Sequence, residues 1–458
     1  MAVKRRIYTL NGYPPEVIAV AFAKTSRSPE PFDKNASELN EDKSRQFHEK
    51  WVINYGHSSI AEHAVLSLAM ENVSILFTKV IEDNRLASYT EKSTRYKIFD
   101  KEHYYKPENI MNSELVKEYQ ESCDFSIDTY TELFNKMTEY MKTRFIKTEE
   151  ESEALYNIKI KNKVLDNIRY MLPVSCLTNL GMTINARNLS RAITKLLSHP
   201  LKEMQEIGQE LKECASNITP TLLKHAEKSE FIEKNDIRLA EMSKTLEGEK
   251  KESQNDIELV HYDPQAEDKF IATILYKNTN LPFKEIMEKV KKLSMQEKQK
   301  IIDSAFENLD KYDTPIRETE IPEYVFDVLI DYGAFRDVQR HRICTQINPD
   351  LTPDYGYSVP QDITEAGFEL HYRECMEKAN LAFKKIKEKF PKEAQYVLPL
   401  AYRKRLLLKM NLREVFHFIR LRSGKTGHIS YRRIAQKMHT LVNEVHPMFG
   451  KNLVVDKS

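Results

Sequence analysis

The chain has 458 residues, which is enough for about two or three ordinary hydrophobic cores, so we expect more than one domain. Its 70 Lys and Arg nearly cancel its 69 Asp and Glu, and the net charge of +1 gives no overall signal for a nucleic-acid partner. The sequence has neither an apolar run of about 18 residues nor a signal peptide. We therefore expect a cytoplasmic protein that contacts neither nucleic acid nor a membrane.

Helix and strand patterns appear early in the chain. Residues 13–28 form an apolar segment after a Pro pair and predict a helix. Residues 64–70 are apolar and predict a strand, and apolar residues at helical spacing over 73–84 predict a second helix. A helix opening like the first returns at Tyr262-Asp263-Pro264. The charged stretch before it, residues 227–256, is predicted to be exposed and partly helical.

An internal repeat is visible near the end of each half. Leu172-Pro173 and Asn185 recur as Leu398-Pro399 and Asn411, at a constant offset of 226 residues (399 − 173 and 411 − 185). We therefore predict a tandem duplication, with homologous domains at 1–230 and 257–458 and a charged linker at 231–256. Strands come early and long helices late in each half, so the predicted class is α/β (α+β), with a sheet and long helices.

Two polar segments could carry function. Arg340-His341-Arg342 follows an apolar segment, and its guanidiniums suit phosphate or carboxylate, although cations at a helix C-terminus are a simpler interpretation. Residues 85–96 are rich in hydroxyls and cations, which favours either a phosphate cradle or a solvated loop. In the turn predicted over residues 56–63, Ser59 and Glu62 have the spacing of a helix capping box, which is the structural interpretation of Glu62.

Several other sites are disfavoured. Glycine is scarce, GxGxxG is absent, and the Gly-Lys-Thr at 424–426 lacks the glycine that a phosphate-binding loop needs five residues earlier. The 5 Cys show no CxxC spacing, so we expect no disulfide framework and no metal site. Cys344 is predicted to be a small core residue, with a nucleophilic thiolate as the alternative.

The segment GHSSIAEH at 56–63, followed by SYTEKSTRY at 88–96, resembles the flavin-dependent thymidylate synthases. Their pattern is GHxSxxEH, RHRxxS, SxRY and a C-terminal block with an NAR-like motif, an LR and a further Arg. The resemblance implies an α/β domain in a homotetramer. It also implies that FAD, dUMP, methylenetetrahydrofolate and NADPH meet at subunit junctions.

The two halves depart from that pattern in opposite places. The first has Asp83-Asn84-Arg85 where the family has RHR, but it keeps the SxRY loop at Ser93–Tyr96 and the upstream Arg169. The second keeps Arg340-His341-Arg342 and the C-terminal block, but it has Gln346–Asp350 in place of SxRY and Gln395 in place of Arg169. We therefore expect one composite site shared by unlike domains, within one chain or between two, and inactive remaining half-sites.

The resemblance assigns roles to particular residues. The substrate-binding residues would be Ser93, Thr94, Arg95, Arg169, Arg340 and Arg432. The catalytic residues would be Arg432, polarising the pyrimidine carbonyl, and His341, close to flavin and folate. The cofactor-binding residues would be His63, Asn185, Arg187, Arg340, His341, Arg342, Asn411 and Arg413.

Three functions follow from the resemblance. The first is flavin-dependent one-carbon transfer to a uracil nucleotide, most simply reductive methylation of dUMP to dTMP. The second is a catalytically inactive paralogue that binds nucleotide or flavin. The third is a flavoenzyme with another pyrimidine substrate or one-carbon product. In each case two chains would supply four domains, so we expect a homodimer that forms a pseudo-tetramer.

Overall fold

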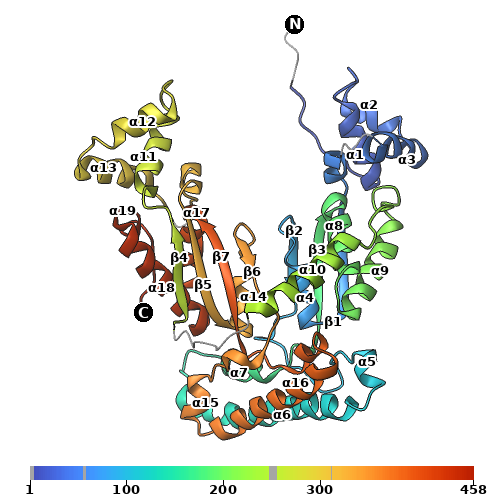
Figure 1. Cartoon of the computed structure of the whole chain (residues 1–458), viewed down its shortest axis with the longest axis vertical. Helices are drawn as coiled ribbons and strands as arrows, with labels where there is room; N and C mark the ends of the chain where they lie inside the picture. Colours follow the sequence, from blue (N-terminus) through green and yellow to red (C-terminus); the bar gives the residue numbers. More distant parts are fainter. Residues whose placement is uncertain (1–4, 55–57, 247–254, 311) are drawn as a thin grey trace. The chain divides into compact units, whose positions relative to one another are not determined.

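The computed structural model describes residues 5–54, 58–246, 255–310 and 312–458 (Figure 1). The chain forms two compact units, each described separately below. Unit 1 consists of residues 1–93, 103–114 and 175–250, and unit 2 of residues 94–102, 115–174 and 251–458. In the described ranges, none of the helices has both the length and the apolar character needed to cross a membrane.

Unit 1 is built around a three-stranded antiparallel sheet of order β1-β3-β2, with strands Val65–Ser74, Leu177–Asn185 and Ala87–Glu91. The predicted strand at 64–70 is thus confirmed. The helix predicted over 73–84 is α4, Ile75–Ile81, which begins after Ser74 because the Ser74 hydroxyl accepts a hydrogen bond from Phe77 N at 2.9 Å. Helices α4 and α8 (Ala186–Leu197) pack on the sheet.

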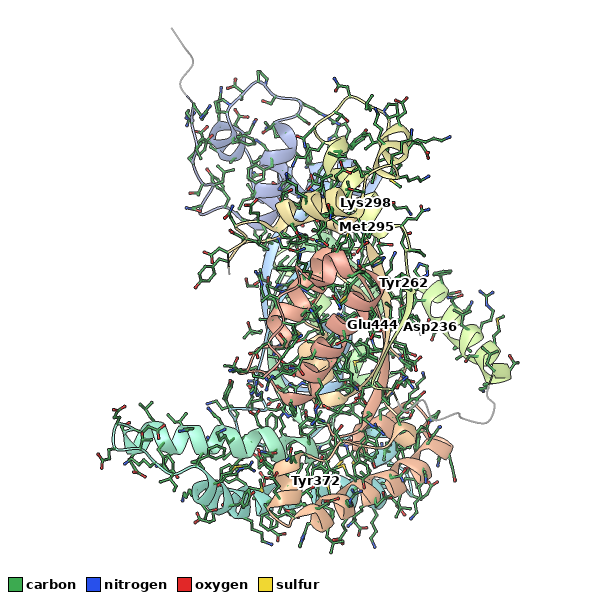
Figure 2. All side chains as sticks on the ribbon, turned by 90° about the vertical axis from the view of Figure 1, so that its left-hand side faces the viewer. Asp236, Tyr262, Met295, Lys298, Tyr372 and Glu444 are labelled. Atoms are coloured by element: carbon green, nitrogen blue, oxygen red, sulfur yellow. The ribbon has the colours of Figure 1, made fainter. Side chains whose placement is uncertain are left out.

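The remaining elements of unit 1 are helical. The predicted N-terminal helix is α1, Pro15–Lys24. The others are α2 (Phe32–Ser37), α3 (Glu41–His48), η1 (Glu49–Asn54), η2 (Ser58–His63), α5 (Glu108–Met111), α9 (Lys202–Ser216), α10 (Glu230–Ser243) and η4 (Lys244–Leu246). Helix α10 has no buried residue, and its Asp236, labelled in Figure 2, is exposed. The exposed, partly helical stretch expected here is present, although residues 247–254 lie outside the described ranges.

Unit 2 has a four-stranded antiparallel sheet of order β4-β5-β7-β6, with strands Ile257–Tyr262, Glu323–Asp331, Arg403–Asn411 and Thr345–Ile347. Its long helices are α6 (Val116–Arg144), α7 (Glu153–Ile168), α16 (Glu369–Lys389) and α18 (Ile429–Val445). Shorter helices are η3 (Arg169–Met171), α11 (Ala266–Tyr276), α12 (Phe283–Val290), α13 (Met295–Phe306), η5 (Arg317–Glu320), α14 (Tyr332–Val338), η6 (Pro353–Tyr355), α15 (Gln361–Glu365), η7 (Glu393–Val397), α17 (Leu412–Arg422) and α19 (Pro447–Gly450).

The internal repeat is visible in the sheet registers. Val65 at the start of β1 pairs with Asn185 at the end of β3, and Glu323 at the start of β5 pairs with Asn411 at the end of β7. Strands β5, β7 and β6 thus repeat the order of β1, β3 and β2, and β4 is an addition to the second sheet. The predicted class, a tandem duplication of mixed helix and sheet, is confirmed.

A reciprocal junction links the two repeats within unit 2. Pro173 pairs with Pro399, Val174 N donates to Leu398 O at 3.0 Å, and Leu400 N donates to Leu172 O at 2.9 Å. These partners are equivalent positions of the repeat, so the junction has local two-fold symmetry. Helices α6 and α16 lie side by side beside it (Figure 1). On α16, the buried Tyr372 (Figure 2) donates its hydroxyl to Ser358 O at 2.8 Å.

The compact units therefore divide the chain differently from the repeats, because α6 and α7 of the first repeat pack in unit 2. The boundaries of the two homologous domains, 1–230 and 257–458, stay a prediction.

Candidate functional site

The Arg340-His341-Arg342 triplet lies just beyond the C-terminus of α14, where the simpler interpretation placed it. The helix begins where β5 ends, because Asp331 Oδ1 accepts a hydrogen bond from Ala334 N at 2.7 Å. The Arg340 side chain is 57% exposed, and its Nε lies 4.0 Å from Asp337 Oδ1. Arg340 can therefore reach a ligand outside this helix.

His341 points inward and is 4% exposed. Its Nδ1 lies 2.7 Å from Glu414 Oε1, and its Nε2 accepts a hydrogen bond from Arg422 Nε at 2.9 Å. Burial lowers the pKa of His341, although Glu414 acts in the opposite direction. The ring is therefore neutral and uses both nitrogens inside the protein. Cys344 is buried and donates its thiol to His341 O, in line with its interpretation as a core residue.

Arg422 is a second cation of this region. Its Nη2 donates to Asp337 O at 2.6 Å, and its guanidinium lies 5.3 Å from the centre of the Tyr431 ring. The sequence placed Arg422 in the C-terminal block as the Arg of LR, but it gave no reason to assign the residue a role. The structure shows that α17 brings the Arg422 side chain next to the Arg340-His341-Arg342 triplet.

The loop of the first repeat reaches the second repeat within unit 2. The buried Thr94 Oγ1 accepts a hydrogen bond from Arg336 Nη1 on α14 at 3.1 Å. Arg95 forks onto the carboxylate of Asp166, with 2.8 Å between Nη2 and Oδ2, and this pairing raises the pKa of Arg95. Residues of the two repeats therefore meet in one chain. Ser93 is the last residue of this segment of unit 1.

Arg169 is the most unusual residue of the region. It is 2% exposed at the start of η3, and in the part of the chain that the structure describes its Nε and Nη2 have no hydrogen-bond partner. Burial opposes its charge, but Tyr170, Asp337 and Asp166 outweigh that effect and raise the pKa of Arg169. A buried guanidinium with unsatisfied donors costs free energy until an acceptor binds it.

At the equivalent position in the second repeat, the side-chain polar atoms all have hydrogen-bond partners. Gln395 is 5% exposed, its Oε1 accepts a hydrogen bond from Leu351 N at 2.8 Å, and its Nε2 donates to Lys392 O at 3.0 Å. The side chain is therefore satisfied within the protein. Of the two equivalent positions, only Arg169 leaves buried donors for a ligand.

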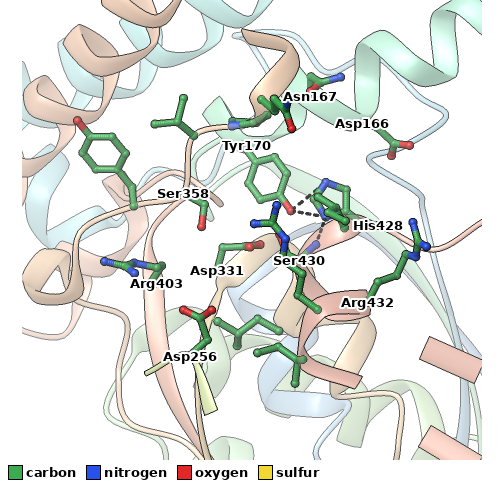
Figure 3. A pocket seen from close by; sticks show the side chains of 18 of the residues that line it. Asp166, Asn167, Tyr170, Asp256, Asp331, Ser358, Arg403, His428, Ser430 and Arg432 are labelled. Atoms are coloured by element: carbon green, nitrogen blue, oxygen red, sulfur yellow. Dashed lines mark hydrogen bonds between the residues drawn. The ribbon is translucent and has the colours of Figure 1, made fainter. Parts of the chain in front are cut away.

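Unit 2 also contains a cavity of about 690 Å³ (Figure 3). Its walls include Asp166, Tyr170, Asp331, Tyr357, Arg403, His428, Ser430 and Arg432. Arg432 is partly buried, and its Nε donates to Ser423 O at 3.2 Å. Its Nη2 also donates to Ser458 O. Among the predicted residues, only Arg432 lines this cavity.

Tyr170 and His428 bring the two repeats together at the cavity wall. The Tyr170 hydroxyl lies 3.1 Å from His428 Nδ1, which also accepts a hydrogen bond from Ser430 N at 3.3 Å (Figure 3). Burial, with the charges of Arg169 and Arg95, lowers the pKa of His428 to about 3, so this ring is neutral. Sequence reasoning missed Tyr170, His428 and Asp166, because nothing in the periodicity distinguishes them from their neighbours on the same helices and turns.

The predicted cofactor residues are spread over both units. Asn185 and Asn411 cap α8 and α17, because each Oδ1 accepts a backbone N–H three residues later, at 2.9 Å. Arg187 pairs with Glu62, and Arg413 Nη1 lies 2.6 Å from Glu320 Oε1. Each pair joins equivalent parts of a repeat, namely the turn before β1 or β5 and the helix after β3 or β7.

The remaining predicted cofactor residues differ in exposure. The exposed His63 packs edge-on against Phe22, with ring centres 5.0 Å apart, and Arg342 is partly buried. The structure therefore brings Thr94, Arg95, Arg169, Arg340, His341 and Arg432 into unit 2 and leaves His63, Asn185 and Arg187 in unit 1.

Comparison with known proteins shows which family this chain matches. Residues 9–221 and 258–448 match the Thy1 family model, described as thymidylate synthase complementing protein. A UPF0159 protein of Chlamydia muridarum is 33% identical over 434 residues, covering 91% of this chain and 82% of that protein. A UPF0159 protein of Thermoplasma acidophilum is 30% identical over 448 residues, 90% of this chain and 88% of its own length.

A flavin-dependent thymidylate synthase of Clostridium tetani is 27% identical over 229 residues. That alignment covers 87% of the synthase but 49% of this chain, as expected if the chain contains two copies of such a domain.

Proposed function

Because this chain belongs to the thymidylate synthase complementing protein (Thy1) family, we propose that it is a flavin-dependent enzyme that transfers a one-carbon group to a uracil nucleotide. The simplest reaction is the reductive methylation of dUMP to dTMP. The observation that carries the proposal is Arg169, whose buried, unpartnered nitrogens lie among further guanidiniums in unit 2.

The charges of this region suit a phosphate monoester. The charges of Asp337, Asp166 and Arg95 act on Arg169, and those of Asp337 and Arg340 act on Arg422. The group thus contains four guanidiniums and three carboxylates, because Asp331 also acts on Arg169. A phosphate dianion would supply acceptors for the donors of Arg169 that have no partner among the described residues.

The nucleoside part of the ligand has room in the neighbouring cavity. Ligand sites of about 300 to 1,000 Å³ are usual for small molecules, and this cavity of about 690 Å³ lies in that range. We assign Arg432 on its wall to the pyrimidine carbonyl, and Thr94 to the phosphate. The Thr94 hydroxyl accepts one bond from Arg336 and still has a hydrogen to donate.

The family implies FAD, and some residues fit its phosphates better than others. The exposed guanidinium of Arg340 and the partly buried one of Arg342 fit an anionic pyrophosphate. His341 offers no ring nitrogen in this conformation, so its proposed contact with flavin would use a ring face or edge. Bound reduced FAD would supply the hydride for the one-carbon transfer. We propose NADPH and methylenetetrahydrofolate as co-substrates.

The test begins with the absorbance of the purified full-length protein, where we expect a flavin spectrum. Calorimetry should then show binding of dUMP and much weaker binding of deoxyuridine, because the nucleoside lacks the phosphate. Protein that carries no flavin and binds neither FAD nor dUMP would overturn the proposal.

Assembly is a separate proposal. Two chains would supply four family domains, so we propose a homodimer, and light scattering of the flavin-containing protein should give twice the 53.7 kDa of one chain. A flavin-containing monomer would contradict it.

A second candidate is an inactive paralogue that binds nucleotide without turnover. It is favoured by the pairing of Arg95 with Asp166 and by Asp83 of the lost triplet, which binds Lys195. Steady formation of dTMP from dUMP, methylenetetrahydrofolate and NADPH would exclude it. Mass analysis of the product from labelled dUMP and other uracil nucleotides would identify a different substrate or one-carbon product.

A further inference from the structure

Three buried or partly buried side chains form a continuous hydrogen-bonded row in unit 2. Glu414 Oε1 bonds His341 Nδ1 at 2.7 Å, and His341 Nε2 bonds Arg422 Nε at 2.9 Å. We propose that Glu414, acting through the imidazole of His341, is a positioning residue that holds the Arg422 guanidinium ready for the anionic nucleotide. This inference rests on the proposed function for the identity of the ligand.

The chemistry of arginine fixes the direction of each bond. A guanidinium only donates hydrogen bonds, so His341 Nε2 must be the acceptor of the Arg422 bond. The ring hydrogen is therefore on Nδ1 and is donated to Glu414, which is an acceptor when ionised. The other tautomer and the imidazolium would both place an N–H against the N–H of Arg422. The carboxylate of Glu414 thus selects the tautomer that Arg422 requires.

The row is anchored at both ends. Glu414 lies in the first turn of α17, where Asn411 Oδ1 accepts a hydrogen bond from its N–H, and Arg422 ends the same helix. Eight residues of helix span about 12 Å, so His341 connects two ends of one rigid element. A second bond, from Arg422 Nη2 to Asp337 O at 2.6 Å, fixes the guanidinium on its other side.

This arrangement makes Arg422 a preorganised cation. A free Arg side chain loses rotamer entropy when it is immobilised. Here His341 and the Asp337 carbonyl hold the side chain before the nucleotide arrives. The backbone carbonyl of His341 accepts bonds from Gln346 Nε2 at 2.8 Å and from the Cys344 thiol at 2.7 Å, so the main chain that carries the imidazole is also held.

The groups that face His341 act on its charge in opposite directions, because Glu414 favours a positive charge on the ring whereas Arg422 and His417 oppose it. They are Glu414, Arg422, the His417 ring at 5.4 Å and the Phe418 ring at 4.7 Å, measured between ring centres. Phe418 supplies an apolar wall, and Arg422 opposes a positive charge on the imidazole.

The test compares Glu414→Met with Glu414→Gln in the full-length protein. The Met side chain removes the acceptor, and we expect dUMP affinity by calorimetry to fall roughly 10- to 100-fold, as for a lost bond to a charged group. In turnover, KM for dUMP should rise more than kcat falls. Gln can still accept from Nδ1–H, so its affinity should stay within about 3-fold of the unmodified protein.

A matched control separates positioning from general damage. Glu267 in unit 2 accepts a hydrogen bond from Met448 N at 2.9 Å and is not part of the row. Glu267→Met should lower the melting temperature without changing dUMP affinity. Unchanged dUMP affinity in Glu414→Met, or equal losses in the Met and Gln variants, would overturn the inference.

A spectroscopic readout does not depend on the proposed reaction. In protein with ¹⁵N-labelled histidine, comparison with His341→Gln identifies the His341 signals among the 13 His. We expect the neutral tautomer with hydrogen on Nδ1, and its loss in Glu414→Met. An Nε2–H tautomer or an imidazolium would overturn the inference. If the unmodified protein binds no nucleotide, the proposed function fails, and these spectra alone decide whether Glu414 sets the tautomer that holds Arg422.

Discussion

Arg169 is a buried residue whose side-chain donors we propose are for a ligand. Its buried Nε and Nη2 have no hydrogen-bond partner among the described residues. Replacement by an apolar side chain of similar length removes these donors, and a buried unsatisfied donor costs about 1 to 3 kcal/mol. We expect Arg169→Met to keep or raise the melting temperature and to abolish dUMP binding. A lower melting temperature would contradict this account of Arg169.

Gln395 provides the matched control for that experiment, because it occupies the same position in the second repeat. Both of its polar atoms are bonded, to Leu351 N and Lys392 O. Gln395→Met leaves the buried Leu351 N and the partly buried Lys392 O without their side-chain partner, so we expect a loss of about 1 to 3 kcal/mol in the free energy of unfolding. Urea denaturation measures the change, and equal effects at Arg169 and Gln395 would remove the distinction between the two half-sites.

His428 should make stability depend on acid. Its folded-state pKa of about 3 lies below the ordinary value of 6.5, so the unfolded chain takes up a proton first as the pH falls. The contribution of the neutral His428 ring to the free energy of unfolding is fully present above pH 6.5, and it is lost as the pH falls from there toward about 3. Each pH unit contributes at most about 1.4 kcal/mol. The melting temperature between pH 7.5 and 4.5 should fall less steeply for His428→Asn, which still caps α18.

Other buried histidines remain in that variant. Burial also lowers the pKa values of His48, His341 and His446, so the pH dependence should become shallower rather than vanish. An unchanged slope would show that His428 does not titrate as expected.

At the scale of helices and strands, the asparagines of the NAR-like motifs have a structural role that explains part of the motif. Asn411 Oδ1 accepts a hydrogen bond from Glu414 N and starts α17. We expect Asn411→Ala to lower the free energy of unfolding by about 1 kcal/mol, and Asn411→Ser to restore most of it. Urea denaturation measures both changes. Bound flavin in the Ser variant tests the predicted cofactor role, because a stable protein without flavin would require a contact beyond the cap.

Sequence patterns predicted an element correctly where the residues of that element alone determine whether it is a helix or a strand. The apolar run at 64–70 and the Pro pair at the start of α1 predicted a strand and a helix that overlap β1 and α1. Sequence patterns failed for Arg422, Tyr170 and His428, because their importance comes from neighbours hundreds of residues away or on another helix. They also missed that α6 and α7 pack with the second repeat, since a repeat offset carries no information about which copy a helix contacts.

At the scale of the whole chain, the composite site can form without a second copy. Thr94 of the first repeat contacts Arg336 of the second within unit 2, and Arg95 and Arg340 belong to the same unit. We therefore expect no recovery of dUMP binding when an Arg95→Ala chain is unfolded, mixed and refolded with an Arg340→Ala chain. Unmodified protein taken through the same treatment is the control. Binding restored by mixing would place the site between chains.

The reciprocal junction at Pro173 and Pro399 also changes how the site responds to dilution. In an assembly of separate subunits, such a two-fold contact would open when the protein concentration falls below its dissociation constant. Here the two sides belong to one chain, so a lower protein concentration does not favour their separation. The pairing of the two half-sites therefore becomes a property of folding, and it should be the same in nanomolar and micromolar protein.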